Sequence, residues 1–212
     1  MVKNKNKKIE IANSLSHLAG AFLGILFLVL MVKKAMFFND PNIPGYAIYG
    51  ACFIFMFLSS ALYHAVFNKK AKKVMRVFDH SAIFIFIAGS YTPIILETFS
   101  GFFRIFFLIL VWSIALGGMI FKFFTFGKYD RFKKISVLIY CLMGWIAVFM
   151  FKELIVTYPW QFMILLIAGG LLYTVGTLFY KMKRPEFHIV WHFFVLFAAI
   201  THFIGYYVYM PV

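Results

Sequence analysis

Long apolar runs alternate with short polar segments along the whole chain. A helix that spans a membrane needs about 20 mostly apolar residues, and runs of that kind recur between clusters of charged residues, Pro and Asn. They predict seven transmembrane helices, at residues 11–32, 46–66, 79–96, 102–121, 135–151, 161–180 and 188–209. Because the connections are short and no low-complexity linker or repeat is visible, we expect one all-α membrane domain over residues 1–212.

The composition points to the same environment. Hydrophobic residues make up 64% of the chain and charged residues 13%, whereas charged residues form about 25% of an ordinary soluble domain. The excess apolar surface needs lipid as its solvent. The formal net charge of +14 is also typical of a nucleic-acid-binding protein, so the placement of the basic residues decides between the two classes.

Most of the 21 Lys and Arg residues lie in the N-terminal tail and in the connections between the second and third, fourth and fifth, and sixth and seventh predicted helices. Cytosolic segments of membrane proteins carry an excess of Lys and Arg. This distribution predicts a multi-pass cell-membrane protein with a cytosolic N-terminus and an external C-terminus, and no nucleic-acid partner. The residues counted are Lys3, Lys5, Lys7, Lys8, Lys69, Lys70, Lys72, Lys73, Arg76, Lys122, Lys128, Arg131, Lys133, Lys134, Lys181, Lys183 and Arg184.

Amphipathic aromatic residues gather at the predicted outer ends of the helices, where such rings favour the membrane interface. They are Tyr46, Tyr49, Tyr158, Trp160, Tyr206, Tyr207 and Tyr209. The basic N-terminus and the apolar run after it resemble a secretory signal. That run is long for a signal core, and no small-residue cleavage site follows it, so we expect a retained signal anchor.

Small residues and one proline inside the predicted spans bear on helix packing. Gly20 and Gly24 form a small-xxx-small pair, which predicts close helix approach, and the pairs at 117–118 and 169–170 suggest the same. Pro93 removes one backbone donor and is expected to kink or end the third helix. Cys52 and Cys141 lie inside spans, so we expect packing residues rather than a disulfide or a thiolate zinc site.

Ionisable side chains inside a span are costly to bury, so each is a functional hypothesis. Six of the seven acidic residues lie at span ends or in connections, where we expect solvation: Glu10, Asp40, Glu97, Asp130, Glu153 and Glu186. Asp79 is the exception. In the predicted orientation Asp79 shares the cytosolic leaflet with five of the six histidines, which come from several helices: His17, His64, His80, His188 and His192.

Three of these histidines have the pattern of metal ligands. His188 and His192 are four residues apart, which places them on one helix face with Cβ atoms about 5–6 Å apart. The pair alone is equally compatible with solvated interfacial histidines. His64 adds a third imidazole from another helix, and three protein ligands plus one water are typical of a catalytic zinc site. Ser60 lies one turn before His64, where its hydroxyl is able to hydrogen-bond a bound water or a substrate carbonyl.

The other histidines are expected to have different roles. His80 lies next to Asp79 and is interpreted as an interfacial neighbour rather than a ligand. His202 is about 15 Å along the helix from His192 at the standard rise. It is therefore too far away to share an ion, and we expect a helix–helix hydrogen bond there.

Several short motifs together resemble a known family. They are Glu10-xx-Asn13-xx-Ser16-His17, the segments 59–64 and 79–81, Ala88-Gly89-Ser90-Tyr91-Thr92-Pro93, and His188-xxx-His192 with the later His202. In order and topology they are similar to the bacterial haemolysin III proteins, the short form of the progestin-and-adipoQ-receptor (PAQR) family, over nearly the whole chain. The long N-terminal region of the animal receptors has no counterpart, so we do not expect hormone recognition.

The resemblance implies a seven-helix bundle with zinc near its cytosolic face. The implied ligands are His64, His188 and His192, with Asp79 as a water-mediated partner and Ser60 as a neighbour. The related alkaline ceramidases resemble this site in arrangement and imply lipid amide hydrolysis.

Three functions remain open at this level. The first is a zinc-dependent intramembrane hydrolase of a lipid amide or ester that acts in membrane lipid homeostasis, with Asp79 and Ser60 as catalytic groups. The second is a pore-forming or cytolytic protein, although its conducting path needs polar residues along the membrane depth and these gather at one end. The third is a non-catalytic membrane sensor or receptor in which zinc cross-links helices.

Overall fold

The computed structural model describes residues 2–210, except for the side chains of residues 2–6, which include Lys3 and Lys5, and of residues 129–130. The described residues form helices joined by short connections, and they contain no strand. Its elements are α1 (Val2–Phe37), α2 (Ile43–Ala65), α3 (Lys69–Thr98), α4 (Gly101–Phe124), α5 (Tyr129–Gly144), the 3₁₀ segment η1 (Trp145–Met150), α6 (Phe151–Thr157), α7 (Trp160–Lys181) and α8 (Glu186–Tyr209).

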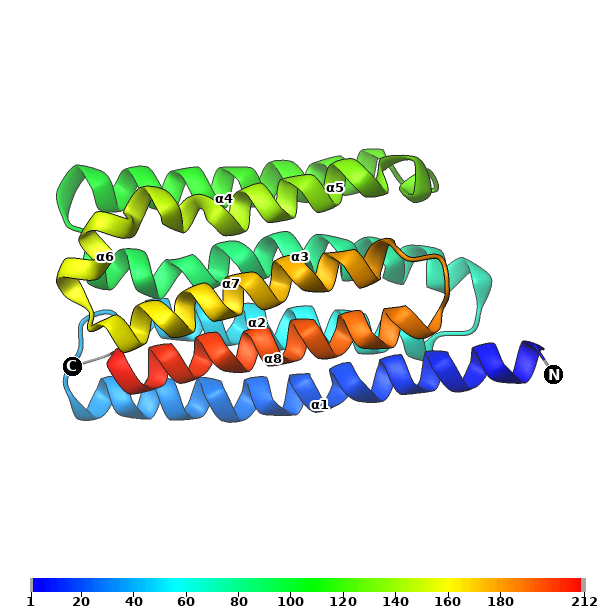
Figure 1. The fold of residues 1–212 in the computed structure, drawn as a ribbon, viewed down its shortest axis with the longest axis horizontal. Helices are drawn as coiled ribbons and strands as arrows, with labels where there is room; N and C mark the ends of the chain where they lie inside the picture. Colours follow the sequence, from blue (N-terminus) through cyan, green and yellow to red (C-terminus); the bar gives the residue numbers. More distant parts are fainter. Residues whose placement is uncertain (1, 211–212) are drawn as a thin grey trace.

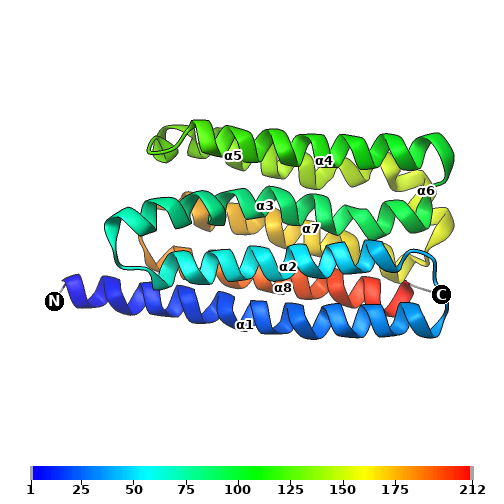
Figure 2. The same cartoon turned by 180° about the vertical axis from the view of Figure 1, so that it is seen from behind.

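Seven segments of the described chain are long and apolar enough to cross a membrane, with α5, η1 and α6 together forming the fifth. This confirms the predicted seven-helix, all-α class. The helices lie in layers (Figure 1): α1 packs against α2 and α8, α3 and α7 follow, and α4 and α5 form the opposite edge. The view from behind shows α2 lying between α1 and α3 (Figure 2).

Several helices are longer than the apolar runs that predict them. α3 begins at Lys69 rather than at residue 79, because a helix does not have to end where the lipid does. The Asn68 side chain caps it by accepting hydrogen bonds from the backbone N–H groups of Lys70 and Ala71, which satisfies donors that have no partner within the helix. This extension carries Arg76 and Asp79 in regular helix at the end of the bundle.

The sequence predicts one regular helix for the fifth span, but the structure shows a change of helix type within it. It changes to 3₁₀ geometry over Trp145–Met150. The Tyr91 hydroxyl donates to the Gly144 carbonyl at 2.5 Å and accepts from the Ala147 N–H at 2.9 Å. Backbone polar groups at membrane depth need such partners because lipid supplies none. The change of helix type is therefore supported by a side chain of α3.

Pro93 does not end the third helix, since α3 continues to Thr98. Hydrogen bonds from neighbouring side chains surround the proline. The Ser90 carbonyl accepts from the Tyr206 hydroxyl at 3.0 Å, and the Thr92 hydroxyl, bound to the Ala88 carbonyl, accepts from the Trp112 indole. Because Pro93 has no N–H, the Gly89 carbonyl loses its helical donor, and these hydrogen bonds reach the carbonyls of Ala88 and Ser90 on either side of it. Neighbouring side chains that support the helix in this region make a proline tolerable within a membrane span.

Close packing at the glycine pair of α1 is as predicted. A Cβ atom on Gly20 would lie 2.3 Å from the Phe57 ring, and one on Gly24 would lie 2.7 Å from the Phe53 ring. The absence of a side chain thus lets α2 aromatic residues pack directly on the α1 backbone. At the pairs 117–118 and 169–170 one glycine of each is closely packed: a Cβ atom on Gly118 would lie 2.5 Å from the Phe84 ring and one on Gly169 would lie 2.2 Å from the His202 ring. Gly117 and Gly170 meet no atom within 4 Å.

The aromatic residues at the end of the bundle where α8 ends are mostly core residues rather than an interfacial belt. Tyr46, Tyr49 and Tyr206 are at most 1% exposed. The Tyr46 hydroxyl donates toward Asp40 at 3.2 Å and Glu97 at 2.6 Å. Asp40 is buried, and the expectation that it is solvated is wrong. The phenol rings fill the space between helices here, and the Tyr46 hydroxyl also serves the carboxyl groups of Asp40 and Glu97.

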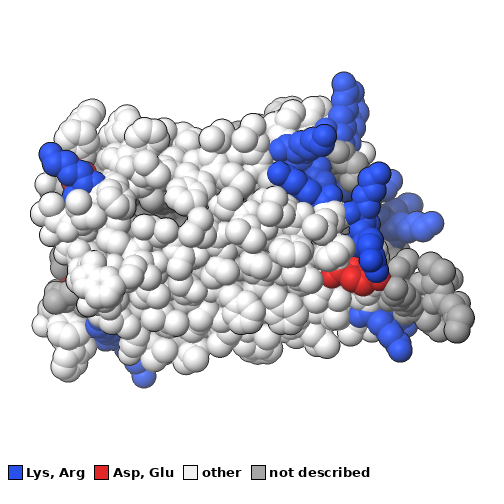
Figure 3. Space-filling view, in the orientation of Figure 1, with Lys and Arg blue, Asp and Glu red and all other residues white. Residues whose placement is uncertain are grey.

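Basic residues gather at the end of the bundle where α1 begins (Figure 3). Lys122, on α4, differs from most of them because it is buried, donating to the Ser136 hydroxyl. At the other end, Lys34 donates to the carbonyls of Tyr207 and Met210. A cation stabilises the C-terminus of a helix, whose carbonyls have no partner within it.

The charge asymmetry predicts that the basic end faces the cytosol. In a Cys52→Ser, Cys141→Ser background, we expect a membrane-impermeant maleimide added to intact cells to label Lys152→Cys but not Lys128→Cys. Both positions are exposed, and they lie at opposite ends of the bundle. Labelling of residue 128 in intact cells, with residue 152 labelled only after lysis, would show the opposite orientation.

Candidate metal centre

Three histidines from two helices converge inside the bundle near its basic end. His64 comes from the last turn of α2, and His188 and His192 come from the first turns of α8. One ring nitrogen from each lies within 4.8 Å of the others, and the Nε2 atoms of His188 and His192 are 3.2 Å apart. Two imidazole ligands of a tetrahedral zinc ion are about 3.3 Å apart at ordinary Zn–N distances. The spacing therefore fits a metal ion.

The second ring nitrogen of two of these histidines faces a hydrogen-bond acceptor. His64 Nδ1 lies 3.4 Å from the Glu10 carboxylate, and His192 Nδ1 lies 3.3 Å from the Asn13 carbonyl. Because these oxygens only accept, they favour a proton on Nδ1 and leave the Nε2 lone pair available. Metal-binding histidines are oriented by such contacts in other proteins.

The buried Nε2 atom of His64 has no hydrogen-bond partner among the described residues. A buried polar atom without a partner costs about 1–3 kcal/mol. A metal ion held jointly with His188 and His192 satisfies it. The donor set, its spacing and its orientation thus fit zinc, which nitrogen ligands suit.

Glu10 is the residue of the site that the sequence interpretation missed, since it was expected to be solvated. Its half-buried carboxylate contacts both His64 and the Lys72 ammonium group. α1 extends beyond the apolar run, which places Glu10, Asn13 and His17 on one helix face at intervals of three and four residues. That spacing, present in the first motif, was the signal available in the sequence.

His17 lies against the three-histidine cluster, whereas His202 lies outside it. His17 is 3% exposed and stacks on His192, with ring centroids 3.6 Å apart and planes 22° apart. It supports the His192 ring from α1. His202 Nε2 lies 3.0 Å from the Leu166 carbonyl of α7, which confirms the predicted helix–helix contact.

Asp79 and Ser60 lie beside the histidines. The Asp79 carboxyl is next to the Ser60 hydroxyl, and both residues line the same cavity as His188 and His192. His80 is buried in the bundle rather than interfacial, and its Nε2 lies 3.4 Å from the Tyr180 hydroxyl. The structure therefore brings together the proposed ligands and the two proposed catalytic groups.

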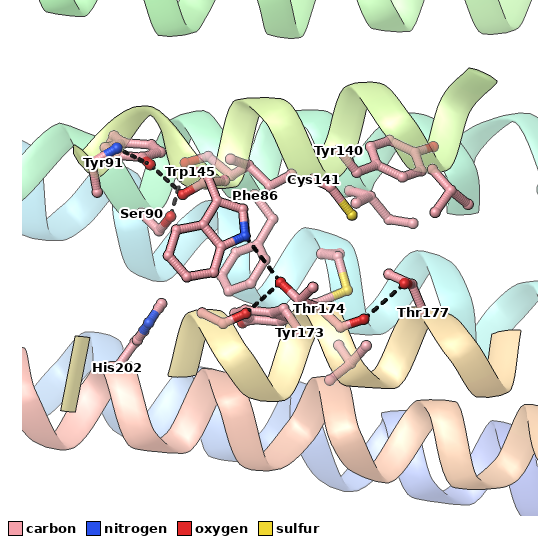
Figure 4. A pocket seen from close by; sticks show the side chains of 18 of the residues that line it. Phe86, Ser90, Tyr91, Tyr140, Cys141, Trp145, Tyr173, Thr174, Thr177 and His202 are labelled. Carbon is pink, nitrogen blue, oxygen red and sulfur yellow. Dashed lines mark hydrogen bonds between the residues drawn. The ribbon is translucent and has the colours of Figure 1, made fainter. Parts of the chain in front are cut away.

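A mainly apolar cavity of about 280 Å³ extends from the histidines between α3, α5, α7 and α8. Figure 4 shows its wall, with Tyr140 and Cys141 on one side, Tyr173 and Thr177 on the other, and His202 toward the far end. The Trp145 indole donates to the Thr174 hydroxyl across this wall (Figure 4). The cavity bordered by α3, α5, α7 and α8 thus suits an apolar chain.

The cavity reaches the outer surface of the bundle. Val148 and Ile167 line it, yet they are 57% and 41% exposed. They belong to η1 and α7, and the surface that these segments share with α5 is hollowed (Figure 3). An opening on the apolar flank of a membrane protein faces lipid rather than water.

The fold and the site define a membrane-embedded helix bundle with a buried three-histidine cluster beside an apolar cavity. The model of the "Haemolysin-III related" family matches residues 5–203, and the chain belongs to this family. It is 39% identical to the Hemolysin-3 homolog of Bacillus subtilis over 198 residues, which cover 92% of each chain. It is a multi-pass cell-membrane protein.

Two further relatives extend the comparison. Hemolysin-3 of Bacillus cereus is 37% identical over 89% of this chain and 86% of its own length. The human monocyte to macrophage differentiation factor is 29% identical over 74% of this chain and 66% of its own length. The similarity thus includes bacterial and animal proteins.

The cluster predicts stoichiometric metal binding. The purified protein should hold about one zinc ion per chain, measured by elemental analysis, and His64→Ala and His188→Ala should each lose most of it. His202→Ala is the matched control, because this buried histidine lies outside the cluster, and it should retain the metal. Zinc retained in both cluster variants would contradict the assignment.

Glu10 predicts a graded effect. Glu10→Gln keeps the size of the side chain but removes the charge that orients His64, so we expect zinc affinity to fall about 10- to 100-fold, measured by chelator competition. Glu153→Gln removes an exposed carboxylate from the opposite end of the bundle and should leave the affinity unchanged. Equal affinities in the two variants would remove Glu10 from the site.

Proposed function

We propose that the protein is a zinc-dependent intramembrane hydrolase of a lipid amide or ester, acting in membrane lipid homeostasis. The observation that carries this proposal is the junction of the three-histidine cluster with the apolar cavity, since His188 and His192 line both. A metal bound there would face a lipid chain directly. A metal that only cross-links helices needs no adjoining cavity.

Each nearby group has a role in such a reaction. Zinc held by the three histidines would lower the pKa of a bound water and polarise the scissile carbonyl. Asp79 takes the proton of the attacking water and returns it to the leaving nitrogen or oxygen as the amide or ester bond breaks. Ser60 donates a hydrogen bond to the carbonyl oxygen as negative charge develops on it. Their adjacency to each other and to the histidines supports this division of work.

The acyl chain of the substrate enters from the bilayer. The cavity wall is largely apolar, and its exposed lining residues Val148 and Ile167 lie on the lipid-facing flank. A chain that moves sideways through this opening never crosses water, so its transfer costs little hydrophobic free energy. Its carbonyl group then lies at the polar end of the cavity, beside Asp79 and Ser60.

A conducting pore has less support. A pore needs polar or charged groups along the membrane depth, whereas the cavity that extends from the site is lined mainly by apolar and aromatic side chains. The name haemolysin belongs to the two Bacillus relatives. A sensor with structural zinc would use the same three ligands, but it leaves the cavity and the adjacent Asp79 without a role.

The proposal predicts turnover of ceramide-like or phospholipid substrates by the purified, zinc-loaded protein. His188→Ala should abolish it, and Asp79→Asn should lower kcat about 10²- to 10⁴-fold because the proton acceptor is lost. Ser60→Ala should lower turnover because the hydrogen bond to the carbonyl oxygen is lost. Ser59→Ala is its control and should not, since Ser59 is buried but does not line the cavity. No turnover above the His188→Ala background across the panel would refute the hydrolase.

A further inference from the structure

A second pocket, of about 260 Å³, opens at the basic end of the bundle. We call it the basic vestibule. Its wall comes from the starts of α1, α3 and α5, the end of α2, and the connection between α7 and α8. Unlike the apolar cavity, it has a mostly polar lining, in which Arg76, Lys133, Lys183 and Arg184 are cations and Glu10 and Asp79 are carboxylates.

The basic vestibule and the apolar cavity meet at the metal centre. Asp79, His80, Tyr180 and His188 line both spaces. An amphiphile whose chain fills the apolar cavity therefore has its polar part in the vestibule, with the bond between them close to the histidines. The chemistry of the vestibule then selects the headgroup.

The cations of the vestibule differ in exposure and contacts. The Arg184 side chain is 75% exposed and lies 3.9 Å from the Glu186 carboxylate. The Lys133 ammonium donates to the Tyr180 carbonyl at 2.7 Å and lies 4.0 Å from the centre of the Tyr180 ring. Arg76 is half-buried. The Glu10 carboxylate already contacts Lys72 and His64. The described lining thus carries more positive than negative charge, and an anion gains from entering it.

Membrane topology alone does not explain this placement. A general excess of cytosolic Lys and Arg requires only that the cations lie at that end of the bundle, as the exposed Lys69 and Lys70 do. Neither of those two lines the vestibule. Arg76 lies two turns farther along α3 from Lys69 and does line it. The half-buried Arg76 and Lys133 thus belong to a concave site, for which phosphate is a well-suited ligand.

We propose that the basic vestibule binds the phosphate group of a membrane lipid whose acyl chain occupies the apolar cavity. This assignment deepens the proposed function by naming its substrate class: a phosphate-bearing lipid rather than one with a neutral headgroup. The assignment rests on the proposed function for the orientation of the lipid, with its acyl chain in the apolar cavity and its headgroup in the vestibule. A neutral headgroup would bring no charge to a lining in which cations outnumber carboxylates.

Lysophosphatidic acid and monoacylglycerol test the inference, since they have the same single chain and differ only by the phosphate. Bromine atoms on the chain quench tryptophan fluorescence, and Trp145 and Trp191 line the cavity, so quenching reports binding. With zinc-loaded protein in a neutral detergent, we expect lysophosphatidic acid to bind at least about tenfold more tightly, as hydrogen bonds between charged groups imply.

Matched variants then test the residues. Arg76→Gln and Lys133→Gln should each weaken lysophosphatidic acid binding by about tenfold and leave monoacylglycerol unchanged. Lys70→Gln removes the same charge at the same end outside the vestibule and should have no effect. Arg76→Lys should keep most of the affinity. Unchanged zinc content and helical circular dichroism in each variant separate the loss of a phosphate contact from misfolding.

Three outcomes would overturn the inference: equal affinities for the two lipids, equal effects of Lys70→Gln and Arg76→Gln, or displacement by glycerol 3-phosphate at the same concentrations as lysophosphatidic acid. The last would mean that a soluble phosphate is the ligand. Because binding needs no turnover, phosphate selectivity without hydrolysis refutes only the hydrolase. Hydrolysis of neutral and phosphate-bearing lipids without selectivity in binding refutes only the vestibule assignment.

Discussion

The absence of water from the hydrocarbon core is the constraint on which the rest of this structure depends. Each polar group at membrane depth needs a partner within the protein. Tyr91 supplies one to the backbone where the fifth span changes helix type, and Tyr46 serves the carboxyl groups of Asp40 and Glu97. The buried Nε2 of His64 has no hydrogen-bond partner among the described residues and belongs to the three-histidine cluster that is spaced to hold a metal ion.

The metal centre depends on a helix that supplies no ligand to it. α1 presents the Glu10 carboxylate to His64, the Asn13 carbonyl to His192, and the His17 ring to the face of His192. These contacts favour a proton on Nδ1 of His64 and His192 and hold the His192 ring plane, which would lower the cost of ordering the three histidines around an ion. The glycine face of α1 allows the close approach to α2 that this arrangement requires.

Much of the fold followed from the sequence, because hydropathy and charge report the average environment of a segment. The seven spans and the helix–helix contact of His202 were predicted correctly. The burial of Asp40 and the role of Glu10 were not, and of the two effects predicted for Pro93, a kink or an end, the end of the helix does not occur. Each of these depends on which neighbouring helix faces a given side chain, such as Tyr46 beside Asp40 or Tyr206 beside the Ser90 carbonyl, and a periodic pattern carries no such information.

Hydropathy, charge and spacing along the chain were enough to predict the seven helices, the concentration of basic residues at one end, and the three candidate ligands, since these are local properties. The convergence of the three histidines, the contact of Glu10 with His64, and the meeting of an apolar cavity and a basic vestibule at this site became visible only in the folded chain. These features arise from packing between helices far apart in the chain, whose mutual positions are set by side-chain contacts over their whole length.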